Sequence, residues 1–176
     1  MIICATALLL FAVRSQAQTS GCFDKGSSVI NFGIGLGTTL YGSGYTGSFP
    51  PISVSYERGI ADGRWGIGAY LAHTGAKYGD KSDYWKFSYT VIGARGDYHF
   101  YTTDKLDTYG GVILGYDIVS DKWHGEGESE EYDASGSSAV FAPFVGGRYY
   151  FSQHVGVFAE LGYGIAWLNL GLNFSL

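Results

Sequence analysis

The sequence contains no uninterrupted apolar run of 18 or more residues, and this excludes a membrane-spanning helix. Only 15% of the residues are charged, whereas 17% are aromatic and 28 are glycine. A disordered chain would carry more charge and fewer aromatic residues. The 176 residues therefore predict one folded domain, and if this domain crosses a membrane it must do so with strands.

Positive charge is also scarce. Eleven Lys and Arg against 16 Asp and Glu give a formal net charge of −5, so we expect no nucleic-acid partner. The four histidines are scattered, without the spacing of a zinc site or a catalytic triad. The stretch GIGLG (33–37) continues a strand pattern and does not open a helix, so it is not a phosphate-binding loop. These observations predict no cofactor, no metal site and no enzymatic activity.

Cysteine is nearly absent, with Cys4 and Cys22 alone. Residues 1–17 have a short apolar core followed by Ser15 and Ala17, small residues that suit cleavage before Gln18, so we predict a signal peptide for Sec-type export. No basic residue precedes the apolar core, which indicates a displaced or truncated start of the sequence. The alternative to a signal peptide is an ordered N-terminal helix. Cleavage would leave Cys22 without a disulfide partner. A lipid-modified cysteine is a second possibility, but the preceding TSG lacks the expected apolar residue, so we favour a free thiol.

Beyond an N-terminal segment at 18–27, the chain alternates apolar and polar residues between clusters of turn formers, the pattern of antiparallel strands. Most of these stretches are long enough for a tilted strand to cross a bilayer. They predict an all-β, eight-stranded antiparallel up-and-down transmembrane β-barrel over residues 28–176. The expected strands are 28–38, 51–58, 64–76, 86–100, 106–119, 138–151, 155–164 and 167–176.

The two faces of each predicted strand indicate the solvent around the barrel. In 167–176 one face carries Leu168, Leu170 and Leu172, while the other carries Asn169 and small residues. Small residues suit a crowded interior, and large apolar ones suit lipid. A soluble sandwich or a lipocalin-like barrel with an apolar cavity is the alternative. The favoured location is the cell outer membrane, with outer-membrane lipid and lipopolysaccharide as neighbours.

Charged residues on the inward-facing positions predict a cluster of mixed sign in the lumen. In VGVFAELGYG (155–164), Glu160 shares the inward face with glycines, and arginines on other strands have the same orientation. Arginines would hold this carboxylate ionised and unsuited to acid–base catalysis. We favour a plug over a gated polar pathway. The predicted cluster is Glu57, Arg95, Asp97, Asp107, Asp117, Arg148 and Glu160.

Aromatic residues on the outward face predict two girdles at the membrane interfaces. The first is Tyr56, Trp65, Tyr98, Phe100, Tyr149, Phe151 and Phe174, and the second is Tyr116, Phe141, Tyr163 and Trp167.

Connections predicted at 59–63, 101–106 and 152–154 are short and would face the periplasm, whereas those at 39–50, 77–85 and 120–137 are longer and would be extracellular. The connection at 165–166 is short and breaks this pattern. The longest connection contains an acidic set, Asp121, Glu126, Glu128, Glu130, Glu131 and Asp133. Such carboxylates with His124 could attract a divalent cation, but the spacing of a calcium loop is missing, so a solvated loop is favoured.

The stretches IGARGDYHF, GGRYYF and the ending AELGYGIAWLNLGLNFSL resemble the small porin-like outer-membrane β-barrel proteins of Bacteroidetes, related in architecture to OmpA and OmpX barrels. The resemblance covers residues 28–176 and implies insertion by the outer-membrane assembly machinery, which reads the last strand. Leu176 replaces the usual terminal aromatic residue, while Phe174 keeps the outward orientation. No catalytic residues are implied.

Three classes of function remain from the sequence. The first is a non-enzymatic barrel with an envelope-structural role or an unknown extracellular ligand bound by its loops. The second is a small passive channel, and the third is a lipid-modifying enzyme, for which no convincing Ser and His pair is seen. The first class is favoured.

Overall fold

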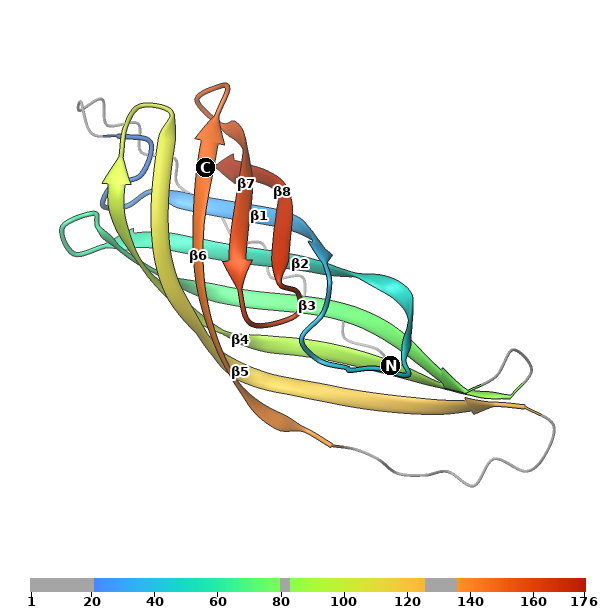
Figure 1. Ribbon diagram of the computed structural model, residues 1–176. Coiled ribbons are helices and arrows are strands. Elements are labelled where there is room, and N and C mark those ends of the chain that lie inside the picture. Colours follow the sequence, from blue (N-terminus) through green and yellow to red (C-terminus); the bar gives the residue numbers. More distant parts are fainter. Residues whose placement is uncertain (1–20, 80–82, 126–135) are drawn as a thin grey trace, which may run out of the picture.

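The computed structural model describes residues 21–79, 83–125 and 136–176, and these form a closed barrel (Figure 1). Each strand pairs antiparallel with the next, and β1 also pairs with β8. The all-β class and the eight-stranded up-and-down topology are confirmed. The strands are β1 (Ser28–Leu36), β2 (Thr46–Ile60), β3 (Trp65–Gly79), β4 (Tyr84–Thr102), β5 (Leu106–His124), β6 (Ser138–Tyr150), β7 (Val155–Gly162) and β8 (Leu168–Ser175).

Alternation along each strand separates a polar inner face from an apolar outer face. Asn31 on β1 is the direct partner of Asn173 on β8, and both are buried in the lumen. The neighbouring pair, Phe32 and Leu172, is exposed on the outside. A barrel with its large apolar side chains outside is the reverse of a soluble one. Within the described residues, no helix has the length and apolar character needed to cross a membrane.

The wall of the barrel is uneven in height. Strands β4 and β5 have 19 residues each, whereas β7 and β8 have 8 each. At about 3.3 Å per residue the longer strands span roughly 60 Å and the shorter ones roughly 26 Å. In Figure 1, β3, β4 and β5 accordingly continue to the lower right, well past β7 and β8. We call this projecting part the extension.

The two ends of the barrel differ. The turn end carries the tight connections 61–64, 103–105 and 151–154, and the loop end carries 37–45, 80–83, 125–137 and 163–167, of which 80–83 is no longer than the turns. The connections predicted at 39–50, 77–85 and 120–137 are shorter in the structure than predicted. The strands continue into them: β2 begins at Thr46, β3 ends at Gly79, β4 begins at Tyr84 and β5 ends at His124. These residues continue the ladders between neighbouring strands, although the apolar outward pattern has ended there.

Candidate functional site in the lumen and on the extension

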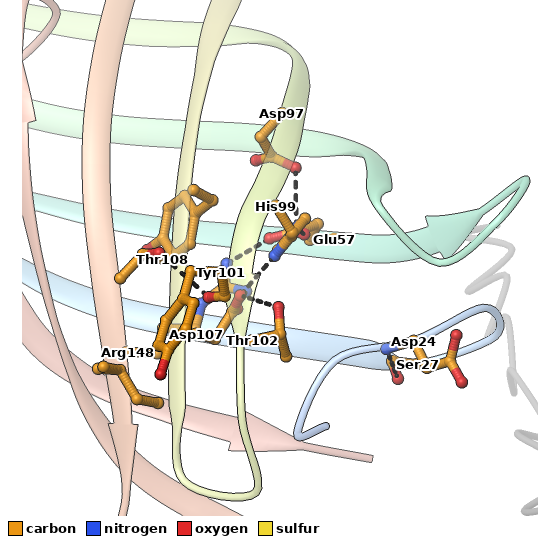
Figure 2. Close-up of polar contacts among 12 residues, drawn as sticks. Asp24, Ser27, Glu57, Asp97, His99, Tyr101, Thr102, Asp107, Thr108 and Arg148 are labelled. Carbon is orange, nitrogen blue, oxygen red and sulfur yellow. Dashed lines mark hydrogen bonds and ion pairs between the residues drawn. The ribbon is translucent and has the colours of Figure 1, made fainter. Parts of the chain in front are cut away.

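Seven buried ionisable side chains meet in the half of the lumen nearest the turn end. Each has the inward orientation on its strand, and each is at most 6% exposed. Five of them are labelled in Figure 2, where they lie side by side on the inside of the wall. We call the seven residues the ionic cluster: Glu57 on β2, Arg95, Asp97 and His99 on β4, Asp107 on β5, Arg148 on β6 and Glu160 on β7.

Arg148 and His99 together bind two carboxylates. Arg148 pairs through Nη2 with Glu57 and through Nη1 with Asp107 Oδ2, at 3.2 Å in the second case. The ring of His99 lies between the same carboxylates, with Nδ1 2.7 Å from Asp107 Oδ1 and Nε2 2.7 Å from Glu57 Oε1. Ionised carboxylates only accept hydrogen bonds, so both ring nitrogens must donate. This geometry requires the imidazolium form of His99.

Arg95 holds the other carboxylates. Its Nε donates to Asp97 Oδ2 at 2.6 Å, and its Nη2 lies 2.8 Å from Glu160 Oε1. Tyr109 donates its hydroxyl to the same oxygen of Glu160 at 2.9 Å. The guanidinium carbons of Arg95 and Arg148 lie 5.3 and 4.2 Å from the centroid of the Tyr109 ring. Four carboxylates are thus matched by two guanidinium groups, one imidazolium and one phenol.

Glycines opposite the cluster make room for it. A Cβ at Gly66 would overlap carboxylate oxygens of Asp97 and Glu57, and a Cβ at Gly146 would lie 2.7 Å from Cγ of Glu160. Both glycines sit on inward positions where any larger residue would collide with an ionic partner. The packing of the cluster therefore depends on these glycines as well as on charge.

The N-terminal segment 21–27 closes the turn end. The buried ring of Phe23 stacks on His99, and the Cys22 amide donates to the carbonyl of Thr103 at 2.7 Å. Gly59 and this segment exchange two backbone hydrogen bonds, both 2.9 Å long, through Gly26 and Ser27. Burial raises the pKa of the Cys22 thiol to about 12. Cys22 is a free cysteine, and its thiol is held in the protonated form.

Apolar side chains fill the lumen on the other side of the cluster. Tyr70, Val91, Ile113 and Ile165 form one buried group with Tyr109. A cavity of about 20 Å³ remains beside Glu160. A space of this size holds about one water molecule.

The ionic cluster contains one set of donors close enough to share a metal ion. Atoms of Glu57, Asp97 and His99 lie within 4.8 Å of one another. Arg148 and Arg95 already occupy these carboxylates, and a cation placed there would face both guanidinium groups. The donor set therefore favours an ion-pair network over metal binding.

Six of the seven residues that the sequence assigned to the lumen cluster belong to it. Asp117 also faces inward and is buried, but it lies ten residues beyond Asp107 on β5 and forms no ion pair with the cluster in the described chain. Sequence reasoning missed His99 and Tyr109, although both share the inward orientation on their strands. It also missed Phe23, because nothing local predicts that this residue folds back over the lumen.

The predicted acidic loop is largely outside the described residues. Glu126, Glu128, Glu130, Glu131 and Asp133 all lie there. Asp121 was assigned to this loop wrongly, because the ladder between β4 and β5 continues past it and pairs it with Phe87.

The residues predicted as aromatic girdles face outward. Trp65, Phe100, Tyr116, Phe141, Tyr149, Phe151, Tyr163 and Trp167 are exposed, and Tyr56, Tyr98 and Phe174 are half-buried. Some pack in pairs, such as Trp65 with Tyr98 at 5.0 Å between centroids, and Tyr163 with Trp167 at 4.7 Å.

Aromatic side chains also cover the inner face of the extension, above the filled lumen. Tyr78, Trp85 and Trp123 form one row of direct cross-strand partners. Rings from the connection between β1 and β2 pack beside them, with Tyr45 5.1 Å from Tyr78 between centroids. We call this surface the aromatic face: Tyr41, Tyr45, Tyr78, Trp85, Phe87, Tyr89 and Trp123.

Comparison with known proteins identifies the fold. No family model matches the chain, and no curated protein matches it in sequence. Among solved structures it is similar to Ail, the attachment invasion locus protein of Yersinia pestis, with a TM-score of 0.53 and 17% identity over 86% of this chain and 95% of that one. It is also similar to the outer membrane protein OprG of Pseudomonas aeruginosa, with a TM-score of 0.56 and 13% identity over 88% and 97%. The chain thus has the fold of small outer-membrane barrels.

Proposed function

We propose that this protein is a non-enzymatic outer-membrane barrel that acts through the surface it presents outside the cell, while its lumen stays closed. Its location is supported by the apolar outer face and by outward aromatic residues toward both ends. Short turns of such barrels face the periplasm, so the turn end would lie inside the envelope and the extension outside the cell.

The contents of the lumen support closure. The ionic cluster connects five of the eight strands, Phe23 covers it from the turn end, and Ile165 and Tyr70 pack on the other side. The interior of an eight-stranded barrel is just wide enough for side chains to fill it. This packing favours a plug over the small passive channel considered as an alternative.

The same contacts support a role without catalysis. A carboxylate that acts as a general acid or base must exchange its proton near neutral pH, and the carboxylates of the cluster are held as ion pairs. The thiolate is the reactive form of cysteine, and the raised pKa of Cys22 disfavours it.

The aromatic face carries the proposal of an external ligand. A row of Tyr78, Trp85 and Trp123 stands on the extension beyond the filled lumen, and Tyr78 is 51% exposed. Aromatic residues combine a large contact area with few side-chain torsions, which makes them common binding anchors. A wall that projects from the membrane with such a row suits contact with a sugar or protein surface outside the cell.

The test is a binding screen of residues 18–176, folded into nanodiscs, on immobilised polysaccharides and extracellular-matrix proteins. We expect at least one ligand to bind the parent and to lose most of its affinity for Trp85→Ala/Trp123→Ala. Tyr101→Ala/Phe151→Ala removes exposed aromatic residues at the turn end and should bind as the parent does. Equal binding by both double variants would contradict the role of the aromatic face.

Planar-bilayer recordings test the closed lumen separately. The parent and Glu160→Gln should both show no stable conductance once folding is verified. Conductance that changes with Glu160→Gln would make the lumen a pathway and would favour the passive channel.

A further inference from the structure

Three lysines form one row across the outer face of the extension. Lys77 on β3 is the direct partner of Lys86 on β4, and Lys86 is the direct partner of Lys122 on β5. All three have the orientation of the exposed outer residues Leu71, Ile92 and Ile118. Lys86 and Lys122 are exposed, and Lys77 is half-buried. We call these three residues the lysine row.

The lysine row concentrates charge of one sign. Cβ atoms of direct antiparallel partners lie about 4.5–5.5 Å apart, and like charges at that spacing destabilise a sheet. Lys77 gains one compensating contact, since its Nζ lies 4.5 Å from the centroid of the Tyr84 ring. None of the three lysines forms an ion pair with another described residue. A multivalent anion from outside the chain would relieve their mutual repulsion.

Neighbouring positions on the same face supply no carboxylate in the described strands. The outward row below the lysines is Gly75, Ser88 and Ser120, and the row above contains Tyr84 and His124. Asp121 directly precedes Lys122 in the sequence but points to the other face, where its partner is Phe87. Within strands β3, β4 and β5 this face is therefore positive, while Asp83 lies at its upper edge before β4 and the whole chain carries a formal charge of −5.

The height of the lysine row matches the polar layer of a membrane. The row of His73, Thr90 and Ile118 marks the upper limit of the large apolar side chains on this outer face. The three lysines lie four residues farther along the same strands, toward the loop end. Four residues of a strand tilted by about 40° rise roughly 10 Å along the membrane normal. Lysine side chains bend toward charged groups at a membrane surface while their stems stay on apolar surface. The row can thus reach the phosphate groups of the outer leaflet.

We propose that the lysine row binds the phosphates of a phosphorylated glycolipid in the outer leaflet, the class that includes lipopolysaccharide. This inference rests on the outer-membrane location proposed above, but not on the aromatic face or on a closed lumen. The surface below the row favours a lipid over a soluble polyanion. An apolar groove of about 500 Å³ begins at Leu71 and His73, below Lys77 on β3, and runs over the outer face of β2, β1 and β8. A soluble polyanion would also meet the net negative charge of the chain, whereas a lipid phosphate is held at the height of the row.

The test is titration of diphosphorylated lipid A into folded protein in zwitterionic micelles, with bound lipid counted by native mass spectrometry. The variant is Lys77→Gln/Lys86→Gln/Lys122→Gln, and the matched control, Lys25→Gln/Arg64→Gln/Lys105→Gln, removes equal charge at the turn end. Each lysine near an anionic surface contributes roughly fivefold in affinity, so the variant should bind on the order of 100-fold more weakly. The control should bind as the parent does, and binding should weaken with salt.

Four outcomes would overturn the inference: no binding of lipid A by the parent, equal affinity of the lysine variant and the parent, equal binding of dephosphorylated lipid A by the parent, or tighter lysine-dependent binding of a soluble sulfated oligosaccharide. The last outcome would identify a soluble polyanion as the ligand. A second experiment distinguishes failure of the lysine row from failure of the proposed outer-membrane location. It measures insertion of the protein into lipid bilayers by its heat-dependent mobility on gels. A parent that inserts but binds no lipid A contradicts the lysine row alone, and one that never inserts contradicts the outer-membrane location.

Discussion

The ring of Phe23 lies flat against the imidazole of His99, with centroids 3.6 Å apart and 8° between the ring planes. His99 in turn donates to Glu57 and Asp107. The N-terminal segment and the ionic cluster are therefore one packed unit, in which an apolar cover shields buried charges from water. Shielding strengthens their attraction, because the effective dielectric constant falls.

Replacing Phe23 by Ala should destabilise the folded barrel. The change removes a buried ring and lets water reach the ionic cluster, so we expect the free energy of unfolding to fall by about 2–4 kcal/mol. Urea unfolding in detergent micelles measures this. Phe100→Ala is the control, since Phe100 follows His99 on β4 but is 57% exposed on the outer face. A loss no larger than that of the control would mean that the segment does not stabilise the cluster.

Cys22 should react slowly with thiol reagents in the folded protein. Burial raises the pKa of its thiol to about 12, so the thiolate fraction at pH 8 should be about 1,000-fold lower than at the ordinary value of 9.0. The rate of iodoacetamide labelling, compared with the urea-unfolded chain, measures this. Phe23→Ala should increase the rate in the folded protein. Labelling of the folded parent at the unfolded rate would contradict the burial of this thiol.

The raised pKa of Cys22 should make the folded protein less stable at high pH. The folded state favours the protonated thiol, so its contribution to stability is fully present below pH 9. It should then be lost as the pH rises from about 9 toward 12. Cys22→Ser removes this titration. In urea unfolding at a series of pH values, the free energy of unfolding of this variant should therefore fall less steeply between pH 9 and 12 than that of the parent.

Strand orientation predicted which side chains enter the lumen, because a period of two depends on the local sequence alone. Orientation says nothing about height within the barrel, which is set by register between strands. Register makes Asp107 the direct partner of Arg148 and leaves Asp117 on the same face but ten residues away. The contact between Phe23 and His99 joins residues far apart in the chain, and such a contact leaves no periodic signal.

The extension was read as loops for a related reason. Beyond His73 the outward positions carry Gly, Ser and Lys, so the apolar alternation ends while the strands continue. Hydrogen bonds to neighbouring strands hold these residues in the sheet, and sequence patterns do not record such bonds. The lysine row and the aromatic face both lie in this part of the chain.

Gly66→Ala should prevent the ionic cluster from packing. The added methyl group would overlap the carboxylates of Asp97 and Glu57, so we expect a loss of about 2–4 kcal/mol or a failure to fold. Gly96→Ala is a matched control, because a Cβ at Gly96 meets nothing within 4 Å. Heat-dependent mobility on gels reports folding, and urea titration reports stability. Similar behaviour of the two variants would show that space beside the cluster is not limiting.

Arg148→Met should lower the free energy of unfolding by more than the small change in side-chain volume would suggest. Arg148 is fully buried and pairs with both Glu57 and Asp107, so its loss would leave two carboxylates facing each other across His99. Breaking a buried pair from one side costs about 3–5 kcal/mol. The double variant Glu57→Gln/Arg148→Met removes the excess carboxylate together with the arginine, leaves Asp107 opposite the His99 imidazolium, and should recover part of the loss. Arg58→Met, at an exposed position on β2, is the control and should cost less than about 1 kcal/mol in urea unfolding. If this double variant were less stable than Arg148→Met alone, the Glu57 carboxylate would be stabilising the barrel without its Arg148 partner, and the ion-pair account of the cluster would be wrong.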